Sequence, residues 1–147
     1  MADLRYKDGA LVDLLSTGLN SFANNARVVS DVVVNATALN LYADFELVVA
    51  YATAPATGKK IGELYILPTV DLTNFATGSD TVNPQRALLV GVFETVAPST
   101  STPERLVLPA ITLPPRNFKV LFKNTSGFNL AATNNTLKMR GYKLESV

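Results

Sequence analysis

Short apolar runs rich in Val, Leu, Thr, Phe and Tyr dominate the chain, and clusters of turn residues separate them. Such runs are typical of β-strands, because branched and aromatic side chains suit a pleated surface. The clearest run is residues 41–51, where apolar and polar side chains alternate and therefore occupy opposite faces. The predicted inward face consists of Leu41, Ala43, Phe45, Leu47 and Val49.

Seven strand segments are clear and an eighth is uncertain. The connections between them are rich in turn residues, and no alternation of strands with helices is present. This pattern predicts an all-β protein, an antiparallel β-sandwich of jelly-roll type with about eight strands. The clear segments are residues 27–34, 41–51, 61–67, 87–94, 104–113, 117–123 and 136–144.

The length of 147 residues predicts one domain. We assign residues 25–147 to the sandwich and residues 1–24 to an N-terminal arm or short helix. Within that opening, residues 10–15 are compatible with one helical turn or with an extended arm. In the sandwich, Pro109 interrupts a strand segment, which predicts an edge strand or a bulge there.

Composition excludes most catalytic chemistry. The chain has no histidine, no cysteine and no tryptophan. Histidine is the commonest general base and transition-metal ligand, and cysteine supplies disulfides and thiolate sites. Ser-His-Asp and Cys-His catalysis and the usual zinc centres are therefore excluded. We expect a non-enzymatic protein without a cofactor or metal.

The remaining composition bears on compartment and partners. A net charge of +1 predicts neither nucleic-acid wrapping nor membrane binding by bulk charge. The first nine residues lack the apolar core of a secretory signal, so we expect a soluble protein made in a reducing compartment. A hydrophobic fraction of 48% with 17% charged residues is high for a monomer. Part of the surface is therefore expected to be covered in an assembly.

Basic residues gather on the last two strand segments, with Phe118, Phe122 and Tyr142 interleaved. If those strands are neighbours, the cluster is either a stacking platform for nucleic acid or carbohydrate or an ordinary charged solvent face. An acidic protein partner is compatible with both interpretations. The cluster consists of Arg116, Lys119, Lys123, Lys138, Arg140 and Lys143.

Residues 70–85 form the longest irregular stretch, and a loop of this length is usually functional or packed against a neighbour. Asp71, Asn74 and Asp80 within it offer oxygen ligands for Ca²⁺. Their spacing does not match an EF-hand, and Asx residues also form turns by bonding to local backbone. We favour turn formation and keep the three residues as possible partner contacts.

Paired carboxylates are the remaining route to an enzyme without histidine, since a glycosidase needs only two of them. Asp44 and Glu46 share one face of a predicted strand, and Glu63 would join them from a neighbouring strand. Acidic residues opposite an apolar face are, however, ordinary for a half-solvated strand. We favour that interpretation.

The segment from Leu113 to Tyr142 resembles a group of small tailed-bacteriophage virion proteins. The matching features are a Pro-Pro corner at 114–115, a Phe-Lys strand, an Asn-Thr-Ser-Gly turn at 124–127, Leu-Ala-Ala at 130–132 and a basic closing strand. Residues 41–47 and 64–71 are also similar, so the resemblance extends over residues 25–144. It implies a structural protein of the head or tail, most specifically a capsid decoration (cement) protein with a jelly-roll core.

The leading hypothesis is therefore a decoration protein that binds across major capsid protein subunits and stabilises the head. It predicts a location in the virion after synthesis in the host bacterial cytoplasm. Major capsid protein or other virion proteins are the expected partners, and a homo-oligomer, with a trimer favoured, is the expected state. No specific nucleic acid and no membrane are expected. The alternative is a carbohydrate-binding host-attachment module that uses loops 70–85 and 95–103.

Overall fold

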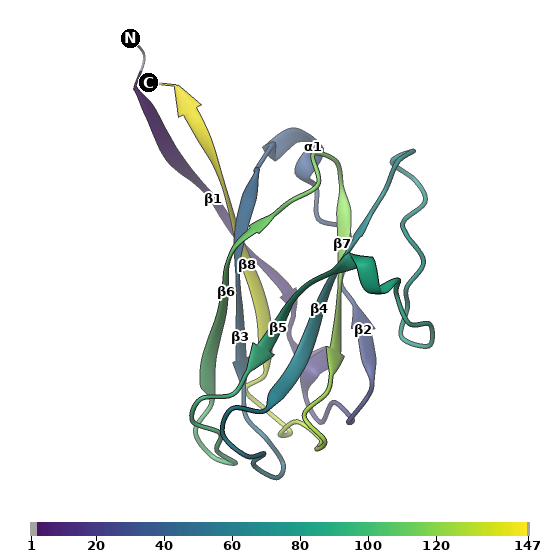
Figure 1. The fold of residues 1–147 in the computed structure, drawn as a ribbon, viewed down its shortest axis with the longest axis vertical. Coiled ribbons are helices and arrows are strands. Elements are labelled where there is room, and N and C mark those ends of the chain that lie inside the picture. Colours follow the sequence, from purple (N-terminus) through teal and green to yellow (C-terminus); the bar gives the residue numbers. More distant parts are fainter. Residues whose placement is uncertain (1–2, 147) are drawn as a thin grey trace.

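The computed structural model describes residues 3–146. Eight strands form two four-stranded antiparallel sheets that pack face to face (Figure 1). Sheet A has the strand order β1-β8-β3-β6, and sheet B has the order β2-β7-β4-β5. The strands are β1 (Leu4–Leu15), β2 (Arg27–Val29), β3 (Tyr42–Val49), β4 (Lys60–Pro68), β5 (Leu89–Glu94), β6 (Glu104–Thr112), β7 (Phe118–Asn124) and β8 (Thr136–Ser146).

The strand pairing is that of a jelly roll. β1 pairs with β8, β2 with β7, β3 with β6 and β4 with β5, so the chain is one long hairpin of four strand pairs rolled into two layers. Each sheet is completed by one further pairing, β3 with β8 and β4 with β7. The predicted all-β, jelly-roll sandwich with about eight strands is confirmed.

The core lies between the sheets and follows the alternation in the sequence. Ala43, Phe45, Leu47 and Val49 are fully buried, as predicted, whereas Leu41 precedes β3 and is exposed. The facing strands of sheet B contribute three of the large aromatic side chains of this core, Phe93, Phe118 and Phe122. Its large buried aromatic side chains are Tyr51, Phe93, Phe118 and Phe122, together with Phe45.

The strand predicted over residues 27–34 is shorter than expected. β2 ends at Val29, and an isolated bridge between Val33 and Phe118 resumes the pairing. Ser30 causes the break, because its hydroxyl oxygen accepts the Val120 amide N–H at 3.0 Å in place of a backbone carbonyl. The chain then turns through the short helix α1 (Asn35–Ala38).

Pro109 lies where the sequence predicted. β6 is an edge strand of sheet A, and its register with β3 shifts between Ala43 and Phe45. Ala110 adopts a left-handed conformation with φ of 54°. The Asp44 carboxylate accepts the Ala110 amide N–H at 2.8 Å and stabilises this bulge. Both the edge position and the bulge are confirmed.

The opening segment is extended, which decides between the two alternatives for residues 10–15. β1 is the edge strand of sheet A, and a single 3-10 turn at Thr17–Leu19 follows it. The structure thus makes most of the predicted arm an integral strand of the sandwich. The pairing of β8 with β3 ends at Tyr142, so beyond that point β1 and β8 pair only with each other. Figure 1 shows this two-stranded part projecting from the body.

The long loop between β4 and β5 covers the outer face of sheet B. Tyr65, Leu67 and Leu121 form a second, smaller apolar cluster there, and Ala76 and Leu88 pack against it. The loop therefore packs on its own sheet. Within residues 3–146 no helix has the length and apolar character needed to cross a membrane.

Candidate functional site

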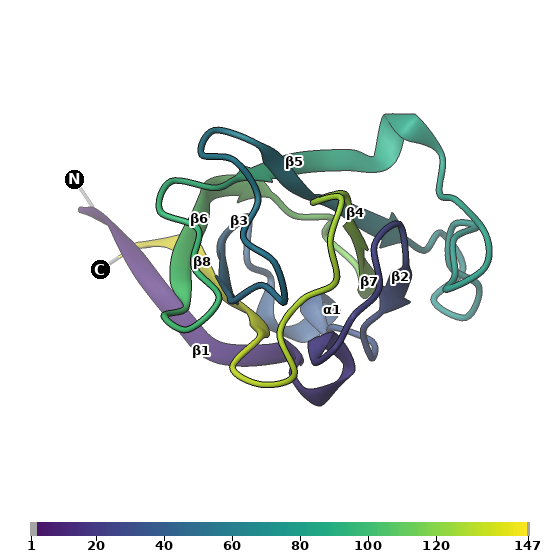
Figure 2. The same cartoon turned by 90° about the horizontal axis from the view of Figure 1, so that it is seen from below.

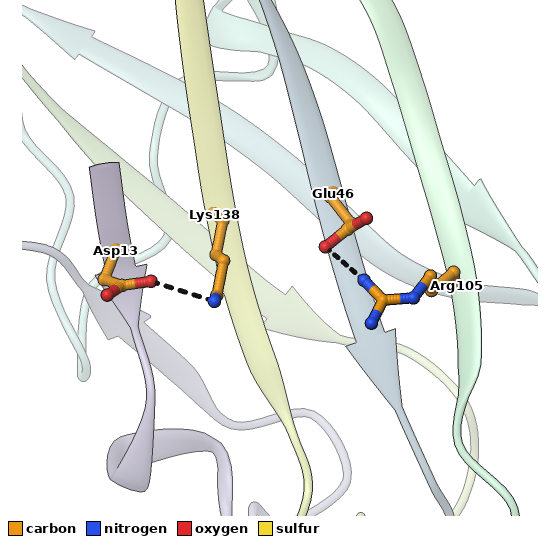
Figure 3. Close-up of polar contacts among 4 residues, drawn as sticks. All are labelled: Asp13, Glu46, Arg105 and Lys138. Carbon is orange, nitrogen blue, oxygen red and sulfur yellow. Dashed lines mark hydrogen bonds and ion pairs between the residues drawn. The ribbon is translucent and has the colours of Figure 1, made fainter. Parts of the chain in front are cut away.

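A row of alternating charges crosses the outer face of sheet A (Figure 3). Lys138 Nζ lies 3.4 Å from Asp13 Oδ1, and Arg105 Nη1 lies 2.7 Å from Glu46 Oε1. The row takes one residue from each strand of the sheet, because Asp13 and Glu46 both face Lys138 in register. These pairs are exposed to solvent, so each contributes little to stability. Their effect is to keep this part of the face neutral.

Two shallow hollows adjoin this charged row. One, of about 390 Å³, lies toward Pro103 and Asn134, and the other, of about 340 Å³, lies toward Leu11 and Val107. Glu46 and Lys138 line both of them. The outer face of sheet A is thus an uneven surface with apolar and charged groups side by side.

The projecting part of sheet A has an apolar outer face. We call residues 4–8 of β1 and 142–146 of β8 the ribbon. On its outer face Leu4 is 69% exposed, Tyr6 71% and Leu144 43%. The outer face also carries Asp8, which lies directly opposite Tyr142. The opposite face, which continues the core-facing side of the sheet, carries the other charges of the ribbon. Those charged residues are Arg5, Lys7, Lys143 and Glu145, with a salt bridge of 2.9 Å from Lys7 to Glu145.

A tyrosine cluster joins the ribbon to the body of sheet A. The Tyr142 ring stacks on Tyr42 with centroids 5.7 Å apart, and Tyr6 meets Tyr142 edge-on at 5.8 Å. Burial raises the pKa of the Tyr142 hydroxyl, and the Asp44 carboxylate and the two other tyrosines add to this. The Tyr142 hydroxyl is therefore neutral near pH 7, and the aromatic surface is continuous with the apolar face of the ribbon.

A second candidate surface lies on sheet B. A groove of about 690 Å³ opens between the long loop and the outer face of the sheet. Asn74, Asp80 and Lys119, three of the residues predicted as partner contacts, line it together. Lys119 Nζ lies 4.9 Å from the centre of the Phe75 ring, which also lines the groove. The remaining lining residues include Val28, Val29, Leu67, Thr77 and Val82.

Local hydrogen bonds fix the beginning of the long loop. Asp71 Oδ1 accepts the amide N–H groups of Thr73 and Asn74, and its Oδ2 accepts the Asn74 side-chain amide. These bonds, those from Asn74 first, hold the pKa of the Asp71 carboxyl well below its usual range. Asp71 is thus a turn former, the interpretation the sequence favoured. Arg116 adds a hydrogen bond of 2.9 Å to the Val70 carbonyl oxygen.

The far end of the loop is held by Arg27 of β2. Its guanidinium donates to Asn83 Oδ1 at 2.8 Å and to the Thr81 carbonyl oxygen at 3.2 Å. Its Nε is buried and, within residues 3–146, has no hydrogen-bond partner. Across the same residues, no group of three or more acidic side chains is placed to hold a metal ion.

The predicted basic cluster is divided between the two sheets. Lys119 and Lys123 lie on β7 in sheet B, whereas Lys138, Arg140 and Lys143 lie on β8 in sheet A. The expectation that these strands are neighbours is wrong, because the rolled topology pairs β7 with β2 and β4, and β8 with β1 and β3. Two strands adjacent in the sequence thus lie in opposite layers.

The same topology separates the candidate carboxylates. Asp44 and Glu46 face outward on β3 in sheet A, whereas Glu63 lies on β4 in sheet B. Glu63 Oε2 accepts the Tyr65 hydroxyl at 2.6 Å. Burial and this bond raise the pKa of Tyr65 to about 12. The expectation that Glu63 neighbours the other two is therefore wrong.

The two loops proposed for carbohydrate do not meet. Loop 95–103 joins the loop before β4, where the Gly58 amide donates to the Thr95 carbonyl oxygen at 2.9 Å. Both lie at the end of the sandwich opposite α1, while the long loop lies beside sheet B (Figure 1). The two loops therefore do not form one site, and loop 70–85 lines a separate groove with sheet B.

Sequence reasoning missed the buried carboxylate of Glu104. Its Oε1 accepts the Tyr51 hydroxyl at 2.6 Å and a short hydrogen bond from the Thr95 hydroxyl. Its Oε2 accepts the amides of Val96 and Ala97, each at 3.0 Å. Burial opposes ionisation, but these four bonds outweigh it and lower the pKa of Glu104. The single Glu thus fastens loop 95–103 to the core.

The ribbon was also missed, although the sequence carried its signal. Residues 4–7 alternate apolar and charged side chains, as Leu-Arg-Tyr-Lys, and Asp8 ends the alternation. That alternation identifies a strand with one apolar face. What the sequence did not show is the direction of this face, because the register of β1 with β8 decides that Leu4 and Tyr6 lie on the outer side of sheet A with Tyr142 and Leu144.

No family model matches the chain, and no curated protein matches it. Several solved structures are similar. They include a CBM36 carbohydrate-binding module in complex with calcium and xylotriose (15% identity, TM-score 0.45, covering 99% of this chain and 94% of that one). A CBM35 module with a glucuronic-acid-containing disaccharide has 12% identity and a TM-score of 0.45, over 84% and 72% of the two chains. A solved structure of Desmodium yellow mottle tymovirus has 13% identity and a TM-score of 0.38, covering 99% of this chain and 88% of that one. The class that the strand order defines is an eight-stranded jelly-roll sandwich.

Proposed function

We propose that the chain is a non-enzymatic structural module that binds neighbouring protein subunits through the outer face of sheet A. The observation that carries this proposal is the ribbon. In the body of a sandwich the inward face of a sheet is apolar and the outward face polar. The ribbon continues the same sheet with largely the opposite arrangement, since Leu4, Tyr6 and Leu144 point outward and every charged residue of the ribbon except Asp8 lies on the other side.

The exposed apolar side chains of the ribbon add little to the stability of the isolated chain, and covering them on assembly adds the free energy of their burial. Burying a side chain of this size stabilises by about 1.5–3 kcal/mol from full exposure. The edge of β1 adds backbone N–H and C=O groups that its neighbour β8 does not use, which suits pairing with a strand of another chain. The charged row and its two hollows would provide the polar part of the same interface.

The resemblance of residues 113–142 supports a more specific role. We propose a virion protein of a tailed bacteriophage, most specifically a capsid decoration protein that contacts the major capsid protein. In this role the projecting ribbon reaches over an adjacent subunit, and copies of the chain associate as a homo-oligomer, with a trimer expected. The protein is made in the bacterial cytoplasm and retained on the particle.

Carbohydrate binding is the second candidate function. The groove under the long loop favours it, because an open groove of about 690 Å³ brings polar side chains together over an apolar floor. Ligand sites are commonly concave, mostly apolar surfaces with a few placed polar groups, of about 300–1,000 Å³. The two functions use opposite sheets and are compatible with each other.

Binding to capsids tests the first proposal. Capsids that lack the protein are incubated with purified protein and sedimented, and the bound fraction is measured. The variant Leu4→Ser/Tyr6→Ser/Leu144→Ser removes the apolar face of the ribbon, and Arg5→Ser/Lys143→Ser is the matched control on its charged face. We expect the first variant to lose retention and the control to keep most of it. Wild-type protein that does not sediment with capsids, or equal retention of both variants, would contradict the proposal.

A further inference from the structure

We infer that the groove between the long loop and sheet B binds a neutral oligosaccharide. This inference rests on the second candidate function and gives it a site and a ligand class. The groove is lined by residues 73–80 and Val82 of the loop, by Val28 and Val29 of β2, and by Leu67 and Lys119 of the sheet.

The polar groups in the groove are available to a ligand. Within residues 3–146, the Asp80 carboxylate and the Thr77 hydroxyl make no hydrogen bond, and Lys119 makes no hydrogen bond or ion pair. The sole polar contact of Lys119 is with the Phe75 ring. By contrast, both oxygens of the nearby Asp71 carboxylate accept hydrogen bonds from residues of its own turn. The groove thus presents one anionic acceptor, one cationic donor and one hydroxyl, each able to form hydrogen bonds with a ligand.

This set of groups selects a neutral ligand that both donates and accepts hydrogen bonds. Asp80 repels an anion and Lys119 repels a cation, so neither kind of ion gains net charge attraction here. A sugar hydroxyl donates one hydrogen bond and accepts others, so neighbouring hydroxyls can satisfy a carboxylate and an ammonium group together. Hydrogen bonds to charged groups are the stronger ones, which compensates for the removal of these groups from water.

The floor of the groove suits the apolar face of a sugar ring. Phe75 and Val82 of the loop and Val29 of β2 supply aromatic and branched surface. The Lys119 ammonium group lies over the Phe75 ring, 4.9 Å from its centre, and this contact fixes the ring and the lysine relative to each other.

The loop is already held in place before any ligand binds. Arg27 holds its far end through Asn83 and Thr81, and the Asp71 turn holds its beginning. Gly78 packs so closely on Leu67 that an added Cβ would lie 3.1 Å from Leu67 Cδ2. A preformed loop avoids the entropy cost of ordering on binding, which matters for a weak polar ligand.

The groove and the ribbon lie on opposite sides of the molecule. Figure 2 shows the long loop beyond β2 and β7 of sheet B, with β1 on the far side of sheet A. A module that binds a particle through sheet A therefore still presents the groove outward. This arrangement suits attachment of a particle to a glycan-coated surface.

An array of neutral and charged oligosaccharides tests the inference, followed by calorimetric titration of the strongest ligand, and binding of charged sugars alone would overturn the inferred ligand class. The variants are Asp80→Asn and Lys119→Met, and Lys123→Met is the matched control, since it lies on β7 but outside the groove. We expect each groove variant to weaken binding about ten- to a hundred-fold, as for loss of a hydrogen bond to a charged group. The control is expected to bind like wild type, with equal thermal midpoints for all proteins.

The outcomes separate the site from the function. If Asp80→Asn and Lys119→Met lose binding and the Lys123→Met control does not, the groove is supported as the binding site. If the wild-type protein and all three variants bind a sugar equally well, the groove is not the binding site, but carbohydrate binding by the protein is still supported. A wild type that binds no sugar at millimolar concentration overturns both the inference and the second candidate function, and leaves the assembly proposal unaffected.

Discussion

Replacing Glu104 tests whether one buried carboxylate fastens loop 95–103 to the core. In Glu104→Ala the Tyr51 and Thr95 hydroxyls lose their acceptor while they are each only 1% exposed. A buried donor without a partner costs about 1–3 kcal/mol, so the two together cost about 2–6 kcal/mol. The amides of Val96 and Ala97 belong to exposed residues and are not counted, because water can replace Glu104 there.

Glu104→Gln should cost less, about 1–2 kcal/mol. Its amide oxygen can take the place of Oε1 and keep the two hydroxyl bonds, while its NH₂ group faces the loop amides and is solvated. The free energy of unfolding is measured by urea titration at pH 7, with the slope of unfolding against urea as a check that both variants unfold as wild type does. A loss below 1 kcal/mol in Glu104→Ala would contradict the reasoning.

Because of the Glu104 carboxylate, the stability of the folded protein should depend on pH. The pKa of Glu104 is lower in the folded protein than its ordinary value of 4.5, so the folded state favours the ionised form. The stabilisation is fully present above that ordinary value and is lost as the pH falls through the folded pKa. Since glutamine does not titrate, the gap in stability between wild type and Glu104→Gln should narrow below pH 4.5. An equal gap at pH 7 and pH 3 would refute the assignment.

Two further substitutions test the packing and the surface charges. In Gly62→Ala the new Cβ falls well inside van der Waals contact with the Phe122 ring, so we expect the free energy of unfolding, measured with urea, to fall by about 1–3 kcal/mol. The control is Gly18→Ala, where the nearest atom lies 3.9 Å from the new Cβ and little change is expected. Equal effects of the two substitutions would argue against this packing. Arg105→Ala removes the exposed pair with Glu46 and should cost only about 0.2–1 kcal/mol, less at high salt. A salt-independent loss of several kcal/mol would show that this pair is not a surface interaction.

The sequence was sufficient for the fold class and for most strands, because each strand carries its own alternation. Within residues 41–51 the inward positions 43, 45, 47 and 49 were predicted correctly, since period-two burial is a local property, and only Leu41, which precedes the strand, was not. Pro109 likewise indicated an edge strand with a bulge, because proline removes a donor that a central strand needs.

Strand adjacency was not predictable in the same way. Lys119 and Lys138 lie on strands that follow each other in the sequence, and a meander would place them side by side. The jelly roll instead sends consecutive strands to opposite sheets, and no local pattern reports this. Glu63 was misplaced relative to Glu46 for the same reason.

The groove was partly foreseen. Asn74 and Asp80 were chosen because they lie in a long loop, and the loop does line a groove with Lys119. Its floor was not predictable, because the loop folds back on Val28 and Val29 from a strand about fifty residues earlier. Glu104 was also missed, since one acidic residue at the start of a strand looks like any solvated position until Tyr51 and Thr95 are placed around it.

The central claim is that the outer face of sheet A, with its ribbon, is covered by another protein. A cryo-EM map of capsids carrying the protein, at a resolution that traces β1 and β8, tests it most directly. We expect Leu4, Tyr6 and Leu144 to be buried against a neighbouring subunit, with the long loop of sheet B facing outward. A map in which the apolar face of the ribbon is open to solvent, or in which sheet B contacts the capsid, would contradict it.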